Sequence, residues 1–200
     1  MDFSTKLIIT KKENMEQTES IKNKFISLIN MIGIKFEEEN EVVNVTKDQS
    51  DLDMSSITSI PENVKFENHG SINLCSITSL SNGTKFFNQG DLDLSSLIEM
   101  PENTEFGNLG DIDLSCVIKI TSSTKFCNHG SVDLSSLTKV PEGMVFNNLG
   151  NLDLSSLTSL PETTKFRNNG KVNLSSLTSI SENFKFENLG SVDLSSLYSE

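Results

Sequence analysis

The sequence predicts a mainly β protein: a right-handed parallel β-helix (solenoid) of about seven and a half 20-residue coils behind a small N-terminal α/β cap. Three observations predict this fold class. Glycine recurs every twenty residues from position 70 to position 190. Apolar residues recur at fixed phases of that period, with strand-like alternation but no sustained helical spacing. Parallel crossover connections are almost always right-handed, which sets the expected hand.

Residues 1–50 are expected to form the α/β capping unit. Residues 5–10 resemble a strand, and Thr10 with Glu13 forms a capping box ahead of a helix that Gly33 ends. Residues 34–36 and 42–45, separated by an acidic turn, are expected to form a hairpin or two short strands. The helix carries its apolar face on Ile21, Phe25, Leu28, Ile29 and Ile32. We expect this unit to cover the first coil, because an uncovered coil leaves unpaired backbone groups, although a separate binding function is the alternative.

Residues 51–200 form the predicted solenoid domain, and its repeat is clearest in LDLSSLTSLPETTKFRNNG at 152–170. Columns of apolar residues begin at Leu52, Met54 and Phe66, and the phenylalanines are expected to stack along the interior. Three short strands separated by bends fit these spacings. Proline at positions such as Pro61 marks one corner, and the Asn-x-Gly at 68–70 and its equivalents marks another, where glycine is expected to adopt a positive φ. The invariant asparagines predict an inward ladder that satisfies backbone groups at that corner.

The repeat resembles two groups of proteins. LDLSSLTSLP at 152–161 is similar to the core of twenty-residue bacterial leucine-rich repeats, and the whole phrase resembles bacterial and phage β-solenoid repeats of the form LxLSSLxxLPExxxFxNxG. Leu157 stands where the leucine-rich family has asparagine, which favours a closed β-helix over an open horseshoe. Pentapeptide-repeat proteins are a more distant resemblance. Neither resemblance implies an activity.

Composition narrows the classes of function. The formal net charge is -12, of which the repeats carry -10, so direct binding of nucleic acid is disfavoured. Cys75, Cys116 and Cys127 occupy different phases and cannot pair between neighbouring coils, which indicates free thiols in a reducing compartment. The N-terminal apolar run is too short for a signal peptide or a membrane span. We therefore expect a cytoplasmic protein that does not bind membranes.

The best candidate for a binding surface is a column of Asp and Asn between two inward apolar columns, thickened by a second acidic column. Stacked carboxylates ~4.8 Å apart repel by ~0.9 kcal/mol per pair even in water, so some benefit should offset that cost. Three explanations stay open: local hydrogen bonds to the backbone, a basic partner surface that meets an imitation of a phosphate strand, and calcium. We name the predicted binding residues the acidic ridge: Asp51, Asp53, Asp91, Asp93, Asp111, Asp113, Asp133 and Asp153.

Catalysis finds little support in the sequence. His69 and His129 share a column but lie three coils apart, and no histidine accompanies the repeated serines. Residues 51–200 contain no insertion from which a cleft could be built. A separate lysine column is expected to pair with glutamates at the proline corner, from Lys65 and Glu62 onward. We expect no enzyme, cofactor or metal site.

The sequence thus predicts a non-catalytic protein-interaction module that acts through its ladder faces and its N-terminal cap. The alternative is an acidic nucleic-acid-mimicking inhibitor, phage-encoded, that occupies the basic groove of a DNA- or RNA-binding protein. A homodimer through the C-terminal coil is also expected, because the edge of that coil would otherwise stay unpaired.

Overall fold

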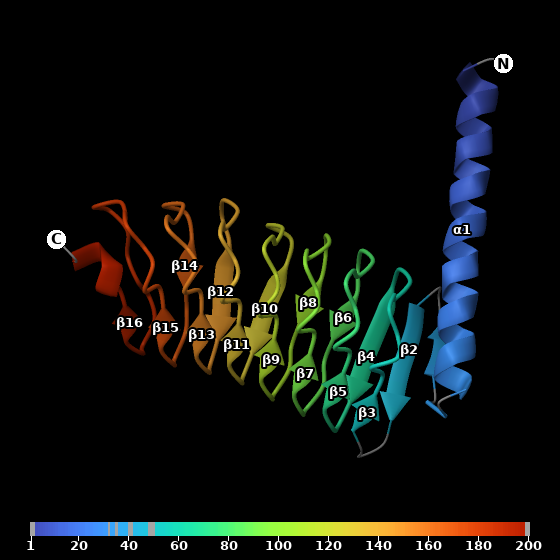
Figure 1. The fold of residues 1–200 in the computed structure, drawn as a ribbon, viewed down its shortest axis with the longest axis horizontal. Coiled ribbons are helices and arrows are strands. Elements are labelled where there is room, and N and C mark those ends of the chain that lie inside the picture. Colours follow the sequence, from blue (N-terminus) through green and yellow to red (C-terminus); the bar gives the residue numbers. More distant parts are fainter. Residues whose placement is uncertain (1–2, 32, 35, 40–41, 48–50, 199–200) are drawn as a thin grey trace.

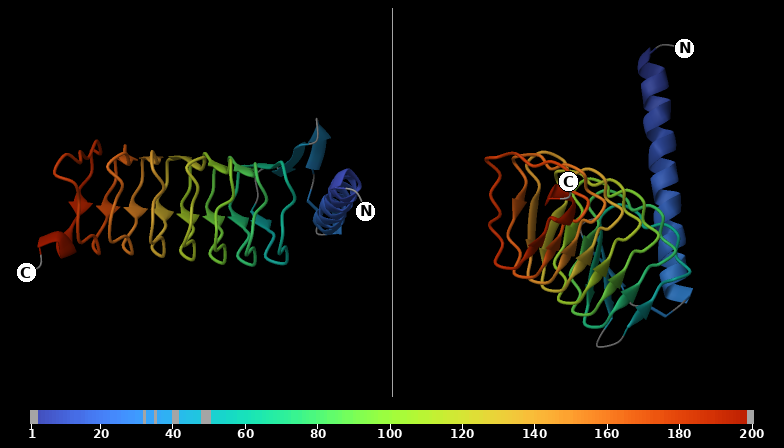
Figure 2. Two further views of the ribbon diagram at one scale, coloured as in Figure 1. Left: turned by 90° about the horizontal axis from the view of Figure 1, so that it is seen from above. Right: turned by 60° about the vertical axis from the view of Figure 1, so that its left-hand side comes forward.

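The computed structural model of the chain describes residues 3–31, 33–34, 36–39, 42–47 and 51–198. It is a parallel β-solenoid with one N-terminal helix, as the sequence predicts, and Figure 1 shows the coils stacked along one axis. Figure 2 shows the helix standing at the N-terminal end of the stack. The right-handed winding stays a prediction.

Helix α1 (Phe3–Met31) occupies most of the N-terminal unit. The strand expected at residues 5–10 is wrong, because the helix already runs through them. No Gly or Pro interrupts the first 32 residues, so nothing local stops the helix from extending across the short apolar run. Gly33 ends the helix as predicted: it has a φ of 75°, and its N–H donates to the carbonyl of Asn30 while the N–H of Ile34 donates to Ile29.

The predicted hairpin is confirmed, and its second strand joins the solenoid. Strand β1 (Phe36–Glu39) pairs antiparallel with β2 (Val42–Lys47), and β2 pairs in parallel with β4 (Val64–Asn68). Phe25 and Ile29 of α1 are buried in the same core as the first coils, whereas Ile32 lies outside the described residues. The N-terminal unit therefore continues one sheet of the solenoid by a strand, while the division at residue 50 stays a prediction.

Two eight-stranded sheets form the coils. Sheet A runs from β1, β2 and β4 through β6 (Lys85–Phe86), β8 (Glu105–Phe106), β10 (Lys125–Asn128), β12 (Val145–Asn148) and β14 (Lys165–Phe166). Sheet B contains β3 (Leu52–Asp53), β5 (Ile72–Asn73), β7 (Leu92–Asp93), β9 (Ile112–Asp113), β11 (Val132–Asp133), β13 (Leu152–Asp153), β15 (Val172–Asn173) and β16 (Val192–Asp193). The chain's last described element is the short 3-10 helix η1 (Ser195–Tyr198).

The third strand expected in each coil is reduced to isolated bridges. Ser59 pairs with Ser79, Ser79 with Glu99, and Glu99 with Lys119. Parallel pairing keeps each residue beside its equivalent twenty positions on, as Val132 beside Leu152 shows. Every column read from the sequence is therefore a physical column along the rod.

The phenylalanine column fills the interior as predicted. Six rings from Phe66 to Phe166 are buried, and successive ring centroids lie 5.0 to 5.8 Å apart in a stacked arrangement. Phe186 continues the stack at 5.7 Å from Phe166, but it is only partly buried. Burying rings of this size contributes ~2 to 3 kcal/mol each, which makes the column a main source of cohesion between coils.

The Asn-x-Gly corner differs from the expected conformation. The glycines at 90, 110, 130, 150, 170 and 190 do not have positive φ. They are required because the chain passes very close to the corner below: a Cβ on Gly130 would lie 2.1 Å from the carbonyl oxygen of Gly110. The predicted asparagine ladder is confirmed in part: the Nδ2 atoms of Asn68, Asn88 and Asn188 donate to the carbonyl of the Gly two residues on, at 2.6 to 2.9 Å. Asn108, Asn128, Asn148 and Asn168 are buried, and their Nδ2 atoms make no such bond among the described residues.

Positive φ occurs instead at the proline corner. Asn63, Gly83, Asn103 and Gly143 have φ between 59° and 76°. The backbone N–H of each of these residues donates to an acceptor in the next coil. The N–H of Gly83 donates to the carbonyl of Glu102 at 3.0 Å, and the N–H of Gly143 donates to Oγ1 of Thr163 at 2.8 Å. Asn and Gly are the residues that adopt this conformation most readily, which accounts for them at this phase.

Candidate binding surface

The acidic ridge follows sheet B on its outer side, with its carboxylates half-buried or exposed. Parallel pairing places Asp93 beside Asp113, Asp113 beside Asp133, and Asp133 beside Asp153. Asn73 interrupts the column between Asp53 and Asp93. The structure therefore places the predicted carboxylates in two neighbouring columns along the rod, of which the column from Asp53 to Asp153 is continuous from Asp93 onward.

Each member of this Asp/Asn column closes a tight turn at the end of its strand. The Oδ1 atom of each member accepts a hydrogen bond from the backbone N–H two residues further on. Asp93 accepts from Ser95 at 3.0 Å, and Asp133 accepts from Ser135 at 2.9 Å. The same bond is made by Asn73 with Cys75 at 3.1 Å and by Asn173 with Ser175 at 3.2 Å. The predicted local hydrogen bond is confirmed, and the bonds made by the two asparagines show that it does not require a charge.

A second ladder, which sequence reasoning missed, runs beside the first. Six residues that begin the sheet B segment each accept the backbone N–H of their equivalent one coil on, at 2.6 to 3.3 Å. The acceptors are Asp51, Ser71, Asp91, Asp111, Ser131 and Asn151. The available signal was that this column holds only Asp, Ser or Asn until Lys171 replaces them. The Asp, Ser and Asn residues of this column share one property, which is a side-chain oxygen that can reach the backbone N–H of the next coil.

In both ladders the hydrogen bond to the backbone can be made without a negative charge. Asn and Ser make these bonds at some coils, so the fold needs an acceptor and not a carboxylate. Aspartate nevertheless occupies six of the eight positions in the column from Asp53 to Asp193, at a repulsive cost of ~0.9 kcal/mol for each pair of neighbouring carboxylates in water. Lys171, whose Nζ lies 2.9 Å from Asp193, is the only basic side chain in these two columns. The negative charge of the ridge is therefore in excess of what the turns require.

Hydrogen bonding lowers the pKa of the two end members of the column. The side-chain and backbone groups of Ser55 lower the pKa of Asp53. The pKa of Asp193 is lowered by Lys171 first, and by Ser195. Both carboxylates therefore keep their charge to a lower pH than an ordinary aspartate does.

The lysine column lies on the outer side of sheet A, and its expected partners at the proline corner are wrong. Lys65 pairs with Glu67 in its own strand, and Lys85 pairs with Glu105 one coil on at 3.4 Å. The reason is geometric: alternate residues of a strand share one face, and parallel pairing sets equivalent residues side by side. Lys85 thus meets Glu105 directly.

Three shallow hollows follow this lysine column along the rod. The first is lined by Asn63, Lys65, Gly83, Lys85 and Phe87 and has about 400 Å³ of space. The second, of about 220 Å³, shares Lys85 and reaches Lys125, and the third, of about 250 Å³, shares Lys125 and reaches Arg167. We call this line the basic groove, defined by Lys65, Lys85, Lys125 and Arg167. Its charge is mixed: Glu105 also lines the second hollow, and Lys65, Lys85 and Arg167 are ion-paired with Glu67, Glu105 and Glu187.

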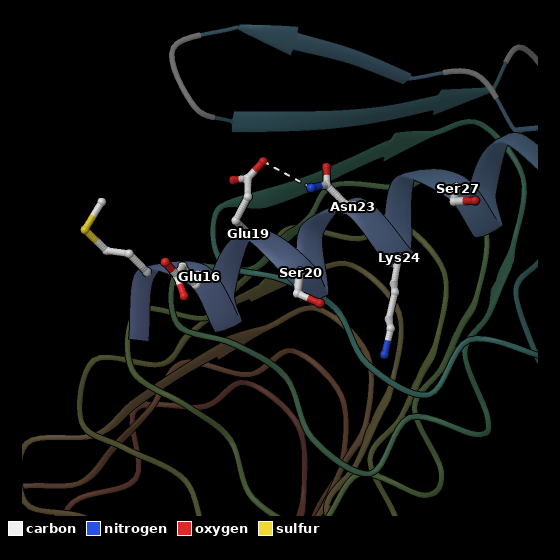
Figure 3. Close-up of a pocket in the computed structure, with 7 residues that line it drawn as sticks. Glu16, Glu19, Ser20, Asn23, Lys24 and Ser27 are labelled. Atoms are coloured by element: carbon white, nitrogen blue, oxygen red, sulfur yellow. Dashed lines mark hydrogen bonds between the residues drawn. The ribbon is translucent and has the colours of Figure 1, made fainter. Parts of the chain in front are cut away.

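A further hollow, of about 880 Å³, lies on the surface of α1 alone. Figure 3 shows the residues from Glu16 to Ser27 that line it, with Asn23 donating to Glu19 at 3.3 Å. All the lining residues come from this one helix, so no groups from other elements converge there. The arrangement is an open helix surface and offers no enclosed site for chemistry.

Two further findings concern cysteine and metals. Cys75, Cys116 and Cys127 are free, as their phases predict. Among the described residues, no three His, Cys, Asp or Glu side chains come together in a way that could hold a metal ion. The ridge carboxylates instead lie in extended lines, each already engaged by a backbone N–H.

The described part of the chain contains no helix that is both long and apolar enough to span a bilayer. Comparisons with protein-family models, with curated proteins and with solved structures find no significant match. The resemblance to bacterial and phage β-solenoid repeats stays an expectation from the repeat phrase.

Proposed function

We propose that the chain is a non-catalytic protein-interaction module, in which the acidic ridge binds a basic surface of a partner protein. The observation that carries the proposal is the excess charge of the ridge. Asn73 and Asn173 make the same turn bonds without charge, so folding does not explain the aspartates. A repulsive row of carboxylates is stabilised when cations lie against it, and such a surface also steers a basic partner into place.

The exposed surface of α1 supplies a second contact region in this proposal. We place the activity in the cytoplasm, because three free thiols persist most readily in a reducing compartment. No cofactor or metal is part of the proposal.

The experiment that tests it is an affinity capture from the native host with an isosteric charge variant. Asp93→Asn, Asp113→Asn and Asp133→Asn together remove three charges and keep an acceptor for each turn bond. The control, Glu102→Gln with Glu162→Gln and Glu182→Gln, removes three exposed charges at the proline corner. The partner should be lost with the ridge variant and kept with the control. Equal capture by the ridge variant and the wild type would contradict the proposal.

A second candidate is an acidic mimic of nucleic acid. It is favoured by the paired columns at Asp91 with Asp93 and Asp111 with Asp113, whose coil spacing of ~4.8 Å is comparable to the 3.4 Å between phosphates of one strand. A mimic should compete with duplex DNA or RNA for the captured partner, and its affinity should fall steeply with salt. Simultaneous binding of nucleic acid and of this chain by the partner would exclude the mimic and leave the interaction module standing.

A further inference from the structure

Two neighbouring coils depart from the repeat on the segment that leads from sheet B to the proline corner. Threonine occupies one exposed column of this segment in five coils, and isoleucine replaces it only at Ile98 and Ile118. These isoleucines are 43% and 48% exposed and lie side by side, since the N–H of Ile118 donates to the carbonyl of Ile98 at 2.9 Å. Threonine and isoleucine are both β-branched, so backbone conformation does not explain the exchange. Adjoining exposed apolar side chains, unlike isolated ones, mark a contact surface.

The next column departs from the repeat in the same two coils. Serine occupies it at Ser59, Ser79, Ser159 and Ser179, whereas these two coils carry Glu99 and Lys119. The two residues form a parallel bridge, and Lys119 Nζ lies 3.2 Å from a carboxylate oxygen of Glu99. Both side chains stay more than half exposed, at 58% for Glu99 and 65% for Lys119. The surface thus presents a negative and a positive charge one coil apart, beside the two isoleucines.

This surface is complementary to a second copy of itself. A two-fold axis that crosses the rod midway between the two coils turns the second copy antiparallel to the first. Ile98 then faces Ile118 of the second copy, and Ile118 faces its Ile98. By the same rotation Glu99 faces Lys119 of the second copy, and the ion pair within each chain becomes half of a square of alternating charges. A two-fold contact of this kind requires only that the surface match itself, as this one does.

From this match we infer that two copies of the chain associate face to face and antiparallel through the isoleucine patch, defined as Ile98, Glu99, Ile118 and Lys119. The patch is separate from the acidic ridge, so the inference goes beyond the proposed function. The isoleucines supply the apolar centre of the contact, and the charges at its edge select the antiparallel direction. Because the patch is small, the dimer should form at high micromolar concentration.

The chain supplies precedents for the variants that test the apolar contact. Ile98→Thr with Ile118→Thr restores the residue that five other coils carry, so the coils should fold normally. The matched control, Leu109→Gln with Leu149→Gln, removes two leucines that are 48% and 44% exposed in a column where Gln89 already occurs. In sedimentation velocity and light scattering on the full chain, the threonine variant should dimerise about tenfold more weakly than the wild type or worse. The leucine control and Leu189→Lys should dimerise as the wild type does.

A charge swap tests the direction of the contact. Glu99→Lys with Lys119→Glu keeps the ion pair within the chain and keeps the match between identical copies, so the swapped chain should dimerise with itself. A wild-type chain facing a swapped chain would instead place Glu opposite Glu and Lys opposite Lys. Native mass spectrometry of isotope-labelled wild type mixed with unlabelled swapped chain at low salt should therefore show both homodimers and few mixed dimers. Salt should weaken this selectivity more than it weakens the dimer.

Three results would overturn the inference. The first is a wild type that stays monomeric at high micromolar concentration. The second is a dimer that the two threonine substitutions leave as strong as before, which would place the contact elsewhere. The third is mixed dimers as abundant as random pairing gives, or more so, which would exclude the antiparallel arrangement. None of these results bears on the capture of a basic partner by the ridge, because every variant keeps all the ridge residues.

Discussion

The substitution Asp113→Asn should leave the protein as stable as the wild type or make it more stable. Asp113 lies between Asp93 and Asp133 in sheet B, so its charge is repelled from both sides. At ~4.8 Å in water each pair costs ~0.9 kcal/mol, and screening in 0.1 M salt reduces the two together to about 1 kcal/mol. Asparagine removes this repulsion and keeps an acceptor for the N–H of Ser115, now bonded at 2.9 Å.

Asp113→Ala is the matched control. Alanine removes the same charge but also the acceptor, at a cost of about 1 kcal/mol for a half-buried hydrogen bond. The alanine variant should therefore be close to the wild type, and the asparagine variant about 1 kcal/mol more stable than the alanine variant. Because coils of a solenoid can unfold in separate steps, urea midpoints of all three proteins should be compared at one salt concentration.

Salt provides a further check on the same variants. In 1 M salt the repulsion is screened, so the advantage of Asp113→Asn over the wild type should disappear while its advantage over Asp113→Ala remains. A loss of about 1 kcal/mol or more on Asp113→Asn would refute the reasoning. It would show that the negative charge of the carboxylate stabilises the turn. The charge of the ridge would then be explained by folding, and it would no longer support the proposed function.

Three other predictions follow from the corners, the pKa values and the last coil. Gly130→Ala should destabilise the rod by about 2 kcal/mol or more in urea, because its Cβ would meet the Gly110 backbone at 2.1 Å, while Gly143→Ala, with open space around it, should cost about 1 kcal/mol of backbone strain. Lys171→Met should raise the pKa of Asp193, as measured by an NMR titration. Because Asp193 has a lower pKa in the folded protein than in the unfolded protein, it contributes stability above its unfolded-state pKa, and this contribution is lost as the pH falls through its folded-state pKa. A homodimer through the C-terminal coil should persist in 0.5 M salt and be lost on Leu189→Lys, since Leu189 is 84% exposed; a salt-resistant dimer that keeps forming with this variant would exclude that coil.

The repeat made most of the fold predictable from the sequence. Period, core columns and corners all follow from which residues recur at which phase, and Leu154 or Phe146 could be placed inside without coordinates. The same residues also placed the ridge on an outer surface. What repetition could not supply was the conformation within a corner, because glycine serves both for positive φ and for close approach of backbones. At Gly130 close approach is the reason, and at Gly143 it is positive φ.

The N-terminal unit was less predictable because nothing in it repeats. The apolar run at residues 7–9 suits a strand or a helix equally, and only the absence of a breaker before Gly33 favours the helix. The basic groove was missed for another reason. Lysines on a strand suggest ion pairs, and only the fold shows that successive hollows along sheet A share Lys85 and Lys125 as lining residues.

Variation within columns indicates which properties the structure constrains. Recent duplication alone would leave any column uniform, so exchanges within a column carry the information. The column from Asp51 to Asn151 exchanges Asp, Ser and Asn but always keeps an oxygen acceptor, and each acceptor is bonded to the next coil. The neighbouring column exchanges Asp for Asn at only two coils, Asn73 and Asn173, although every one of its turns would accept either. Hydrogen bonding explains the first pattern completely. It does not explain the preference for aspartate in the second column, and this difference is what supports the proposed contact with a basic partner.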